Sequence, residues 1–309
     1  MGAVSGRAAD PVERGFPHLV TVRSAVTALY RRLSADTVGQ FAASVVPAEV
    51  ALGDGEDVHL GAQRVAGALV QHLRLPRARI VVSFRAMEQA ASVELAAGPE
   101  YFVELNERFR SHRRDVGAAL AHEVMHVYLH RVDLAFPGVG ANEILTDTAA
   151  AYLGSGWLLL DAFRQDGVSS QKLGYLTPEE FGYVLAKRAA VFGEDPSSWF
   201  TSAEAYEAYV VGRARARRDG MRPPLTGSGW VARRAYVRDR RWAGRWGGRA
   251  GRGAVADGEG WVFEPGVERG GGLRVAFACP ECFQRIRVPV QGPVRVRCGL
   301  CRAVVDCDT

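Results

Sequence analysis

The sequence predicts an α+β protein: a mainly helical domain with a small antiparallel sheet, followed by a small β module. Three observations predict this class. Apolar residues recur at helical spacing through most of the first 219 residues. Short β-branched or alternating stretches lie between residues 79 and 106, and two Cys-x-x-Cys pairs lie near the C-terminus. We therefore expect a flexible tail at 1–15, a main domain at 16–219, a linker at 220–272 and a terminal module at 273–309.

The composition is that of an ordinary globular chain. Its 309 residues, 48% of them hydrophobic, are enough for two domains and a sizeable core. No apolar run reaches the roughly 18 residues of a membrane span, and residues 1–10 lack the apolar core of a signal peptide. All five cysteines follow residue 278, with metal-like spacing that suits a reducing compartment. We expect a cytoplasmic protein without membrane association.

Helical periodicity and helix-start signals predict six main helices. They are Phe16–Leu33, Val58–Leu73, Asp115–His130, Glu143–Phe163, Pro178–Phe192 and Ser202–Arg218. Gly154 and Gly156 interrupt the fourth helix and predict a bend, and Thr177 followed by Glu180 predicts a capping box at the fifth. The expected strands are Arg79–Phe84, Ala91–Ala96 and Tyr101–Asn106.

A His-Glu-x-x-His array lies in the third helix. His122 and His126 are four residues apart and share one helix face, so both imidazoles can bind one Zn²⁺. Glu123, beside the first histidine, can polarise a water on that ion. The same five-residue array also arises by chance in long helices, and that structural alternative stays open on the array alone.

A downstream segment favours a metal site. Two histidines leave a zinc ion short of a ligand, and Glu143 at the start of the next helix is the candidate third. Asp147, one turn later, can hydrogen-bond a ligand imidazole, and Asn142 is a second candidate for such support. His130 shares the face of His126 and is an alternative ligand. The length of helix between His122 and His130, about 12 Å at roughly 1.5 Å per residue, favours a structural role for it.

The combined motif resembles that of the gluzincin metallopeptidases, in which HExxH is followed by a glutamate in an NExxxD context. The runs HEVMHVYL and NEILTDTAAAYL are also similar to the peptidase domain of plant LIM-domain ubiquitin-activated peptidases. The resemblance covers residues 100–165, about a fifth of the chain. It implies a zincin-like fold and a zinc metallopeptidase, more readily an endopeptidase than an exopeptidase, that acts on a protein or peptide with Glu123 as general base.

The resemblance also implies two further parts of such a site. One is an antiparallel edge strand before the metal helix that binds substrate backbone, and Tyr101–Asn106 is the candidate. A plain core strand is the equal alternative for that segment. The other part is a tyrosine or histidine that donates to the oxyanion. Tyr152, Tyr175 and Tyr183 are candidates by residue type alone.

The terminal module is predicted to be a zinc ribbon. Cys279, Cys282, Cys298 and Cys301 form two Cys-x-x-Cys pairs, which can supply four thiolates to one structural zinc. Two alternating stretches between them, Arg285–Val290 and Val294–Arg297, predict a hairpin. So small a module needs the metal to fold, and Cys307 is left over as a free thiol. The chain is thus expected to bind one catalytic and one structural Zn²⁺.

Glycine, arginine and tryptophan dominate residues 220–272, and the scarcity of aliphatic residues predicts a linker. Its aromatic residues either dock on the main domain, the favoured interpretation, or bind nucleic acid together with the arginines. With the ribbon, this segment is the candidate surface for a nucleic-acid or protein partner. Two alternative functions remain: a nucleic-acid-associated protease of the SprT type, which takes a third histidine, and a catalytically silent zinc-binding regulatory module.

Overall fold

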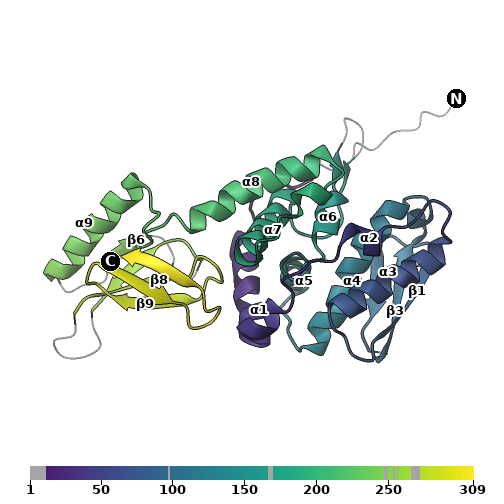
Figure 1. Ribbon diagram of the computed structural model, residues 1–309, viewed down its shortest axis with the longest axis horizontal. Coiled ribbons are helices and arrows are strands. Elements are labelled where there is room, and N and C mark those ends of the chain that lie inside the picture. The colour runs from purple at the N-terminus through teal and green to yellow at the C-terminus, as the bar shows by residue number, and fades with distance from the viewer. Residues whose placement is uncertain are drawn as a thin grey trace. The chain divides into compact units, whose positions relative to one another are not determined.

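The computed structural model describes residues 12–96, 98–165, 170–246, 250–252, 255, 257–265 and 272–309 (Figure 1). These residues combine helices with small sheets, which confirms the α+β prediction. The chain divides into two units. Unit 1 comprises residues 1–19 and 39–213, and unit 2 comprises residues 20–38 and 214–309.

Unit 1 is built around one buried helix, α4. Its helices are α2 (Pro47–Val50), α3 (Val58–His72), α4 (Val116–Arg131), α5 (Val139–Tyr152), α6 (Trp157–Asp161), α7 (Pro178–Phe192) and most of α8 (Ala203–Asp219). Helix α4 is buried on nearly all sides because α3, α5, α6 and the sheet pack around it (Figure 1). Short helix α2 packs on α3, and a two-stranded ribbon, β4 (Arg164–Gln165) with β5 (Ser170–Gln171), precedes α7. The side chains of α4 are therefore held by surrounding core.

The three-stranded sheet of unit 1 has the order β1 (Arg79–Arg85), β3 (Glu100–Asn106), β2 (Ala91–Glu94). Strand β1 pairs with β3 in parallel and β2 pairs with β3 antiparallel, so the predicted all-antiparallel sheet is wrong. The edge-strand role predicted for Tyr101–Asn106 is also wrong, since β3 is the central strand. Tyr101, Val103 and Leu105 of β3 are buried and pack inward, and β2 occupies the edge.

Two helix boundaries show how local signals act. The predicted helix Glu143–Phe163 is divided into α5 and α6 at Gly154, whose φ of 104° ends the first helix, so the predicted interruption is confirmed. Helix α5 begins earlier than predicted, at Val139. Helix α7 has the predicted bounds, and its capping box is confirmed by reciprocal bonds of 3.1 Å between Thr177 and Glu180.

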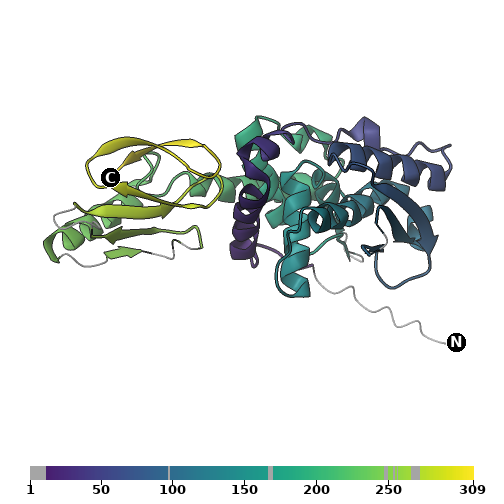
Figure 2. The same cartoon turned by 90° about the horizontal axis from the view of Figure 1, so that it is seen from below.

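In the part of the chain that the structure describes, unit 2 combines helices with two small sheets (Figure 2). Its elements are α1 (Leu19–Gly39), α9 (Trp230–Trp246), β6 (Ala250–Arg252), β7 (Trp261–Glu264), β8 (Arg274–Ala278), β9 (Arg285–Pro289), β10 (Pro293–Arg297) and β11 (Val304–Asp308). Four strands form a sheet of order β6-β7-β8-β9, and β10 pairs with β11. The predicted hairpin between β9 and β10 is wrong, because each Cys-x-x-Cys turn instead joins the two strands of a hairpin, β8 to β9 and β10 to β11.

The described part of the predicted linker is ordered structure, so that prediction is wrong there. Residues 220–272 contribute helix α9 and strands β6 and β7, and β7 pairs with β8 of the ribbon. Aromatic residues replace the missing aliphatic ones: Tyr236 of α9 packs on Trp261 and Phe263 of β7, with ring centroids 5.6 and 5.0 Å away. The remaining residues of that segment, 247–249, 253–254, 256 and 266–271, lie outside the described residues.

The predicted tail also needs correction. Residues 1–11 lie outside the described residues, but Arg14 and Gly15 bind the carboxylate of Glu179 at 2.6 and 3.0 Å. The N-terminal helix α1, predicted as part of the main domain, groups with the ribbon. Thr27 donates a 2.7 Å hydrogen bond to the carbonyl of Cys282, in the first Cys-x-x-Cys turn.

The break between α5 and α6 gives a test of local packing. A Cβ added at Gly156 would lie 2.4 Å from the backbone Cα of Ala151, whereas one at Gly140 in α5 would meet nothing within 4 Å. We expect Gly156→Ala to destabilise the protein by about 2 kcal/mol or more through overpacking. Gly140→Ala should stabilise it by about 0.5–1 kcal/mol. Thermal unfolding followed by circular dichroism measures both, and equal midpoints would contradict this account of the break.

Candidate metal centre

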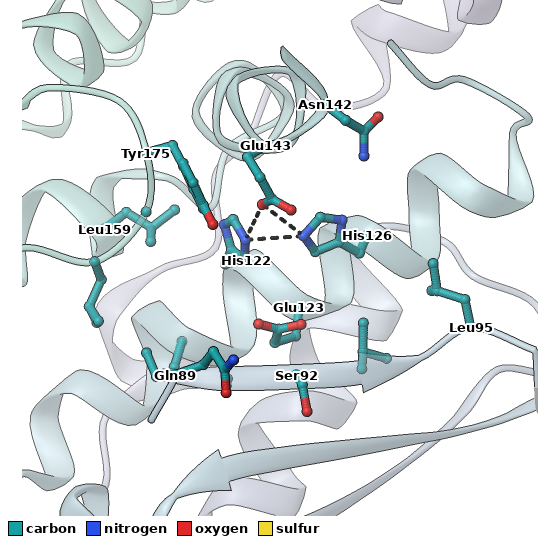
Figure 3. Close-up of a pocket in the computed structure, with 16 residues that line it drawn as sticks. Gln89, Ser92, Leu95, His122, Glu123, His126, Asn142, Glu143, Leu159 and Tyr175 are labelled. Carbon is teal, nitrogen blue, oxygen red and sulfur yellow. Dashed lines mark hydrogen bonds and ion pairs between the residues drawn. The ribbon is translucent and has the colours of Figure 1, made fainter. Parts of the chain in front are cut away.

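Three ligand atoms converge at one point in unit 1 (Figure 3). The Nε2 atoms of His122 and His126 lie 3.1 Å apart, and Oε2 of Glu143 lies 3.0 and 3.2 Å from them. A tetrahedral ion with bonds of about 2.0–2.1 Å separates its ligand atoms by about 3.3 Å, so the triangle has the dimensions that a zinc-sized ion requires. All three residues are those predicted from the sequence. Their side chains are only 13–16% exposed.

Side chains of helix α5 orient both imidazoles through their Nδ1 atoms. Nδ1 of His122 lies 2.8 Å from Oδ1 of Asp147, and Nδ1 of His126 lies 3.3 Å from the hydroxyl of Thr146, which donates to the Asn142 carbonyl at 3.0 Å. Each Nδ1 therefore has a partner, which leaves each Nε2 facing the other two ligand atoms. The two Nε2 atoms and Oε2 of Glu143 are called here the ligand triangle. The predicted support by Asp147 is observed. Thr146 was missed, although it follows Glu143 by three residues and so shares its helix face.

The side chain of Asn142 has a different contact from the one predicted. Its Oδ1 accepts a 3.1 Å hydrogen bond from the backbone N–H of Phe136 and so closes the loop that leads into α5. Asn142 also lines the pocket, but among the described residues its amide makes no hydrogen bond to either histidine. Only the backbone carbonyl of Asn142 takes part in the support of His126, through Thr146.

Asp147 also holds the loop that covers one side of the site. Its carboxylate is fully buried, and Oδ2 accepts hydrogen bonds from the backbone N–H groups of Tyr175 and Leu176, the latter at 3.0 Å. Gly174, with φ of 83°, passes so close to it that an added Cβ would lie 2.6 Å from Oδ2. One carboxylate thus ties a ligand imidazole to the loop 173–176.

A pocket of about 480 Å³ opens beside the ligand triangle. Strand β2 and the residues before it line one wall, Leu159 and the loop 173–175 line another, and Glu123 lies between them. Figure 3 shows the Glu123 carboxylate below the two histidines, on the side of β2 and Ser92. Tyr175 stacks on His122 with ring centroids 6.4 Å apart and an interplanar angle of 21°, and its hydroxyl end is directed toward the ligand triangle (Figure 3).

The electrostatics of the site follow from burial and opposite charge. Burial lowers the pKa of His122, but the charge and hydrogen bond of Asp147 outweigh burial and bring that pKa well above its usual value. Burial raises the pKa of the Glu143 carboxyl, yet hydrogen bonds from His122 and His126 outweigh it and hold the pKa at about 2. Burial also raises the pKa of Glu123 above its usual value. The negative charge gathered here suits a cation, which would displace protons from the imidazoles.

The structure separates the other candidates of the sequence. His130 is exposed at the end of α4 and does not belong to the ligand group. Tyr152 and Tyr183 are completely buried in the core, whereas Tyr175 lines the pocket. Of the three tyrosines proposed by type, Tyr175 alone lies at the site.

The four cysteines predicted for the ribbon form a second group in unit 2. Sγ of Cys279 lies 3.7 Å from that of Cys301, and Cys282 and Cys298 are the same distance apart. Four thiolates around an ion with Zn–S bonds of about 2.3 Å are about 3.8 Å apart, so the group fits a closed tetrahedral site. Cys307 lies outside the group, and burial raises the pKa of its thiol to about 11, which disfavours the thiolate form.

Comparison with known protein families, curated proteins and solved structures finds no match to this chain. No described helix is long and apolar enough to cross a membrane.

The contact between Gly174 and Asp147 predicts a loss of metal affinity in Gly174→Ala. The added Cβ would push the loop away from Asp147 or displace its carboxylate, and loss of such a supporting partner weakens metal binding by about 10–100-fold. Gly193→Ala is the matched control, because Gly193 has a similar φ of 76° with nothing near its Cβ position. Metal release from the histidine–glutamate site to a fluorescent chelator measures the effect, with the cysteine site as internal reference. Equal affinities in the two variants would contradict the role of this contact.

Proposed function

We propose that the chain is a zinc-dependent peptidase whose active site is the pocket beside His122, His126 and Glu143. The observation that carries the proposal is the buried carboxylate of Glu123, which shares that pocket but is not one of the converging ligands. A purely structural ion is normally enclosed by four protein ligands, as the cysteine group of unit 2 would enclose one. Here three described ligands face an open pocket, which is the arrangement that catalytic zinc sites share.

The chain's own groups supply the proton chemistry. When bound, zinc supplies Lewis-acid chemistry, polarising a carbonyl and making water acidic near neutral pH. Glu123 takes a proton from the attacking water and passes it to the leaving amine. Its raised pKa, caused mainly by burial, makes it a stronger base than an exposed glutamate.

Tyr175 is the group proposed to bind the oxyanion. Its hydroxyl end is directed toward the ligand triangle, and burial raises its pKa, so the hydroxyl keeps its proton and remains a hydrogen-bond donor. The bonds from the loop backbone to Asp147 fix the position of the tyrosine relative to His122. A donor placed in advance stabilises developing negative charge without reorganisation.

The edge strand β2 is the proposed binding site for substrate backbone. Among the described residues it pairs on one side only, with β3, and residues 89–93 line the pocket. An extended peptide can add to such an edge through main-chain hydrogen bonds. This mode of binding favours an unfolded or flexible segment of a protein as substrate, cleaved internally.

The general-base role predicts that Glu123→Gln retains metal and fold but loses hydrolysis by about 100-fold or more. A peptide library made from digested cellular protein, analysed for new termini by mass spectrometry, avoids the need for a known substrate. Glu107→Gln is the control, because Glu107 is exposed and outside the pocket. Unchanged cleavage by Glu123→Gln would refute its role. A metal-loaded wild-type chain that cleaves no library peptide would overturn the peptidase proposal in favour of a silent binding module.

The oxyanion role predicts that Tyr175→Phe lowers kcat by about 10²–10³-fold and leaves KM nearly unchanged, because the hydroxyl acts mainly in the transition state. The measurement uses a peptide identified from the library. Tyr206→Phe is the control, since Tyr206 is exposed and lies on α8, outside the pocket. A change confined to KM would show that Tyr175 only contacts the bound substrate.

A further inference from the structure

Helix α9 carries an unusual exposed face in unit 2. Four arginines and two tryptophans share it, because their positions fall within an arc of about 120° at 3.6 residues per turn. The residues are Trp230, Arg234, Arg238, Arg241, Trp242 and Arg245, called here the arginine face. Trp230 is 70% exposed and Trp242 is 50% exposed, which is high for so large an apolar side chain.

The opposite face of α9 is occupied. Ala235, Tyr236 and Ala243 are buried, and the helix packs against β6 and β7 (Figures 1 and 2). Arg233 binds Asp308, and Arg240 donates to the carbonyl of Thr309 at 2.8 Å. These inner contacts fix the helix, so the arginine face has one defined orientation in unit 2.

The positive charge of the arginine face is largely uncompensated. Among the described residues, Arg234, Arg241 and Arg245 have no carboxylate partner, and Arg238 has only an exposed contact of 3.5 Å with Asp239. The guanidinium of Arg234 lies 4.7 Å from the ring centroid of Trp230, so charge and aromatic surface are presented together. The first and last of the four arginines are 11 residues apart, or about 17 Å along the helix axis.

A shallow hollow extends this surface beyond the first residue of α9. Its exposed lining residues include Arg218, Met221, Trp230 and Val231. Glu259 also lines it, and its carboxylate is paired with Arg215 and Arg222. Arg218 has no carboxylate partner among the described residues and adds a further positive charge. The surface therefore combines arginines with exposed apolar side chains at both ends of the arginine face.

We propose that the arginine face binds single-stranded nucleic acid without sequence preference. Arginines at successive turns contact successive phosphates, and Trp230 and Trp242 offer ring faces on which unpaired bases stack. Stacking on a side chain requires a base that is free of its duplex neighbours, which favours a single strand over a duplex. This inference is independent of the peptidase proposal, since it rests on unit 2 alone.

The packing of α9 argues against a bilayer as the partner. A helix that lies on a membrane buries a continuous apolar face in the lipid. The apolar face of α9 is already covered by β6 and β7, and the exposed tryptophans are interleaved with arginines. An anionic polymer that combines phosphates with planar bases matches both kinds of side chain.

The test is fluorescence anisotropy of a labelled 20-nucleotide oligo(dT) with the full chain. The triple variant Arg234→Gln/Arg238→Gln/Arg241→Gln should weaken binding by about tenfold or more, and the slope of log K against log salt should fall by about 2. The control triple Arg79→Gln/Arg85→Gln/Arg108→Gln changes net charge equally at exposed positions of unit 1 and should leave both values nearly unchanged. Trp230→Ala should weaken binding about fivefold or more without changing the salt slope.

Several results would overturn the proposal. The first is that oligo(dT) does not bind at low salt. The second is that the two triple variants lose affinity for it equally, and the third is that a duplex of equal length binds more tightly. Binding to phosphatidylserine vesicles but not to oligo(dT), lost in the α9 triple variant, would assign the face to a membrane surface instead. Circular dichroism of the variants checks that α9 remains folded, which is expected because all the substituted side chains are exposed.

Discussion

The site in unit 1 depends on one buried carboxylate, that of Asp147. Its Oδ1 lies 2.8 Å from Nδ1 of His122, and its Oδ2 accepts hydrogen bonds from two backbone N–H groups of the loop that carries Tyr175. A buried carboxylate without such partners would be costly, so the imidazole, the loop and the helix α5 must keep their relative positions. The ligand triangle and the pocket wall are thereby fixed together, before any ion or substrate binds.

Unit 2 has little aliphatic core, so other interactions must stabilise it. The four cysteines can supply a metal staple, aromatic residues of α9 and β7 supply apolar area, and Thr27 of α1 caps a Cys-x-x-Cys turn. Because α1 belongs to this unit, a chain cut before the ribbon would leave α1 without its partners. Full-length variants are therefore the sound way to separate the two metal-ligand groups.

Local patterns predicted the local structure well. The 3.6-residue period placed α3 and α7 within a residue of their observed bounds, and the spacing of His122, His126 and Glu143 predicted the ligand triangle. Local errors are confined to helix ends, such as the start of α5 at Val139, and the larger errors are non-local. Strand order, the pairing of β7 with β8 and the grouping of α1 with the ribbon depend on contacts between distant segments, which periodicity does not encode. The sequence pattern does not predict the role of Gly174, because that role arises only where the loop meets Asp147 in three dimensions.

The most direct test of the central claim is the metal content of the full chain after dialysis against a weak chelator. The account predicts two zinc ions per chain, one held by each ligand group, with Glu143→Ala losing one and the control Glu107→Ala losing none. Cys298→Ser should lose the other ion independently. Two ions retained in Glu143→Ala, or one ion in the wild-type chain that disappears with Cys298→Ser, would show that the histidine–glutamate group does not bind metal.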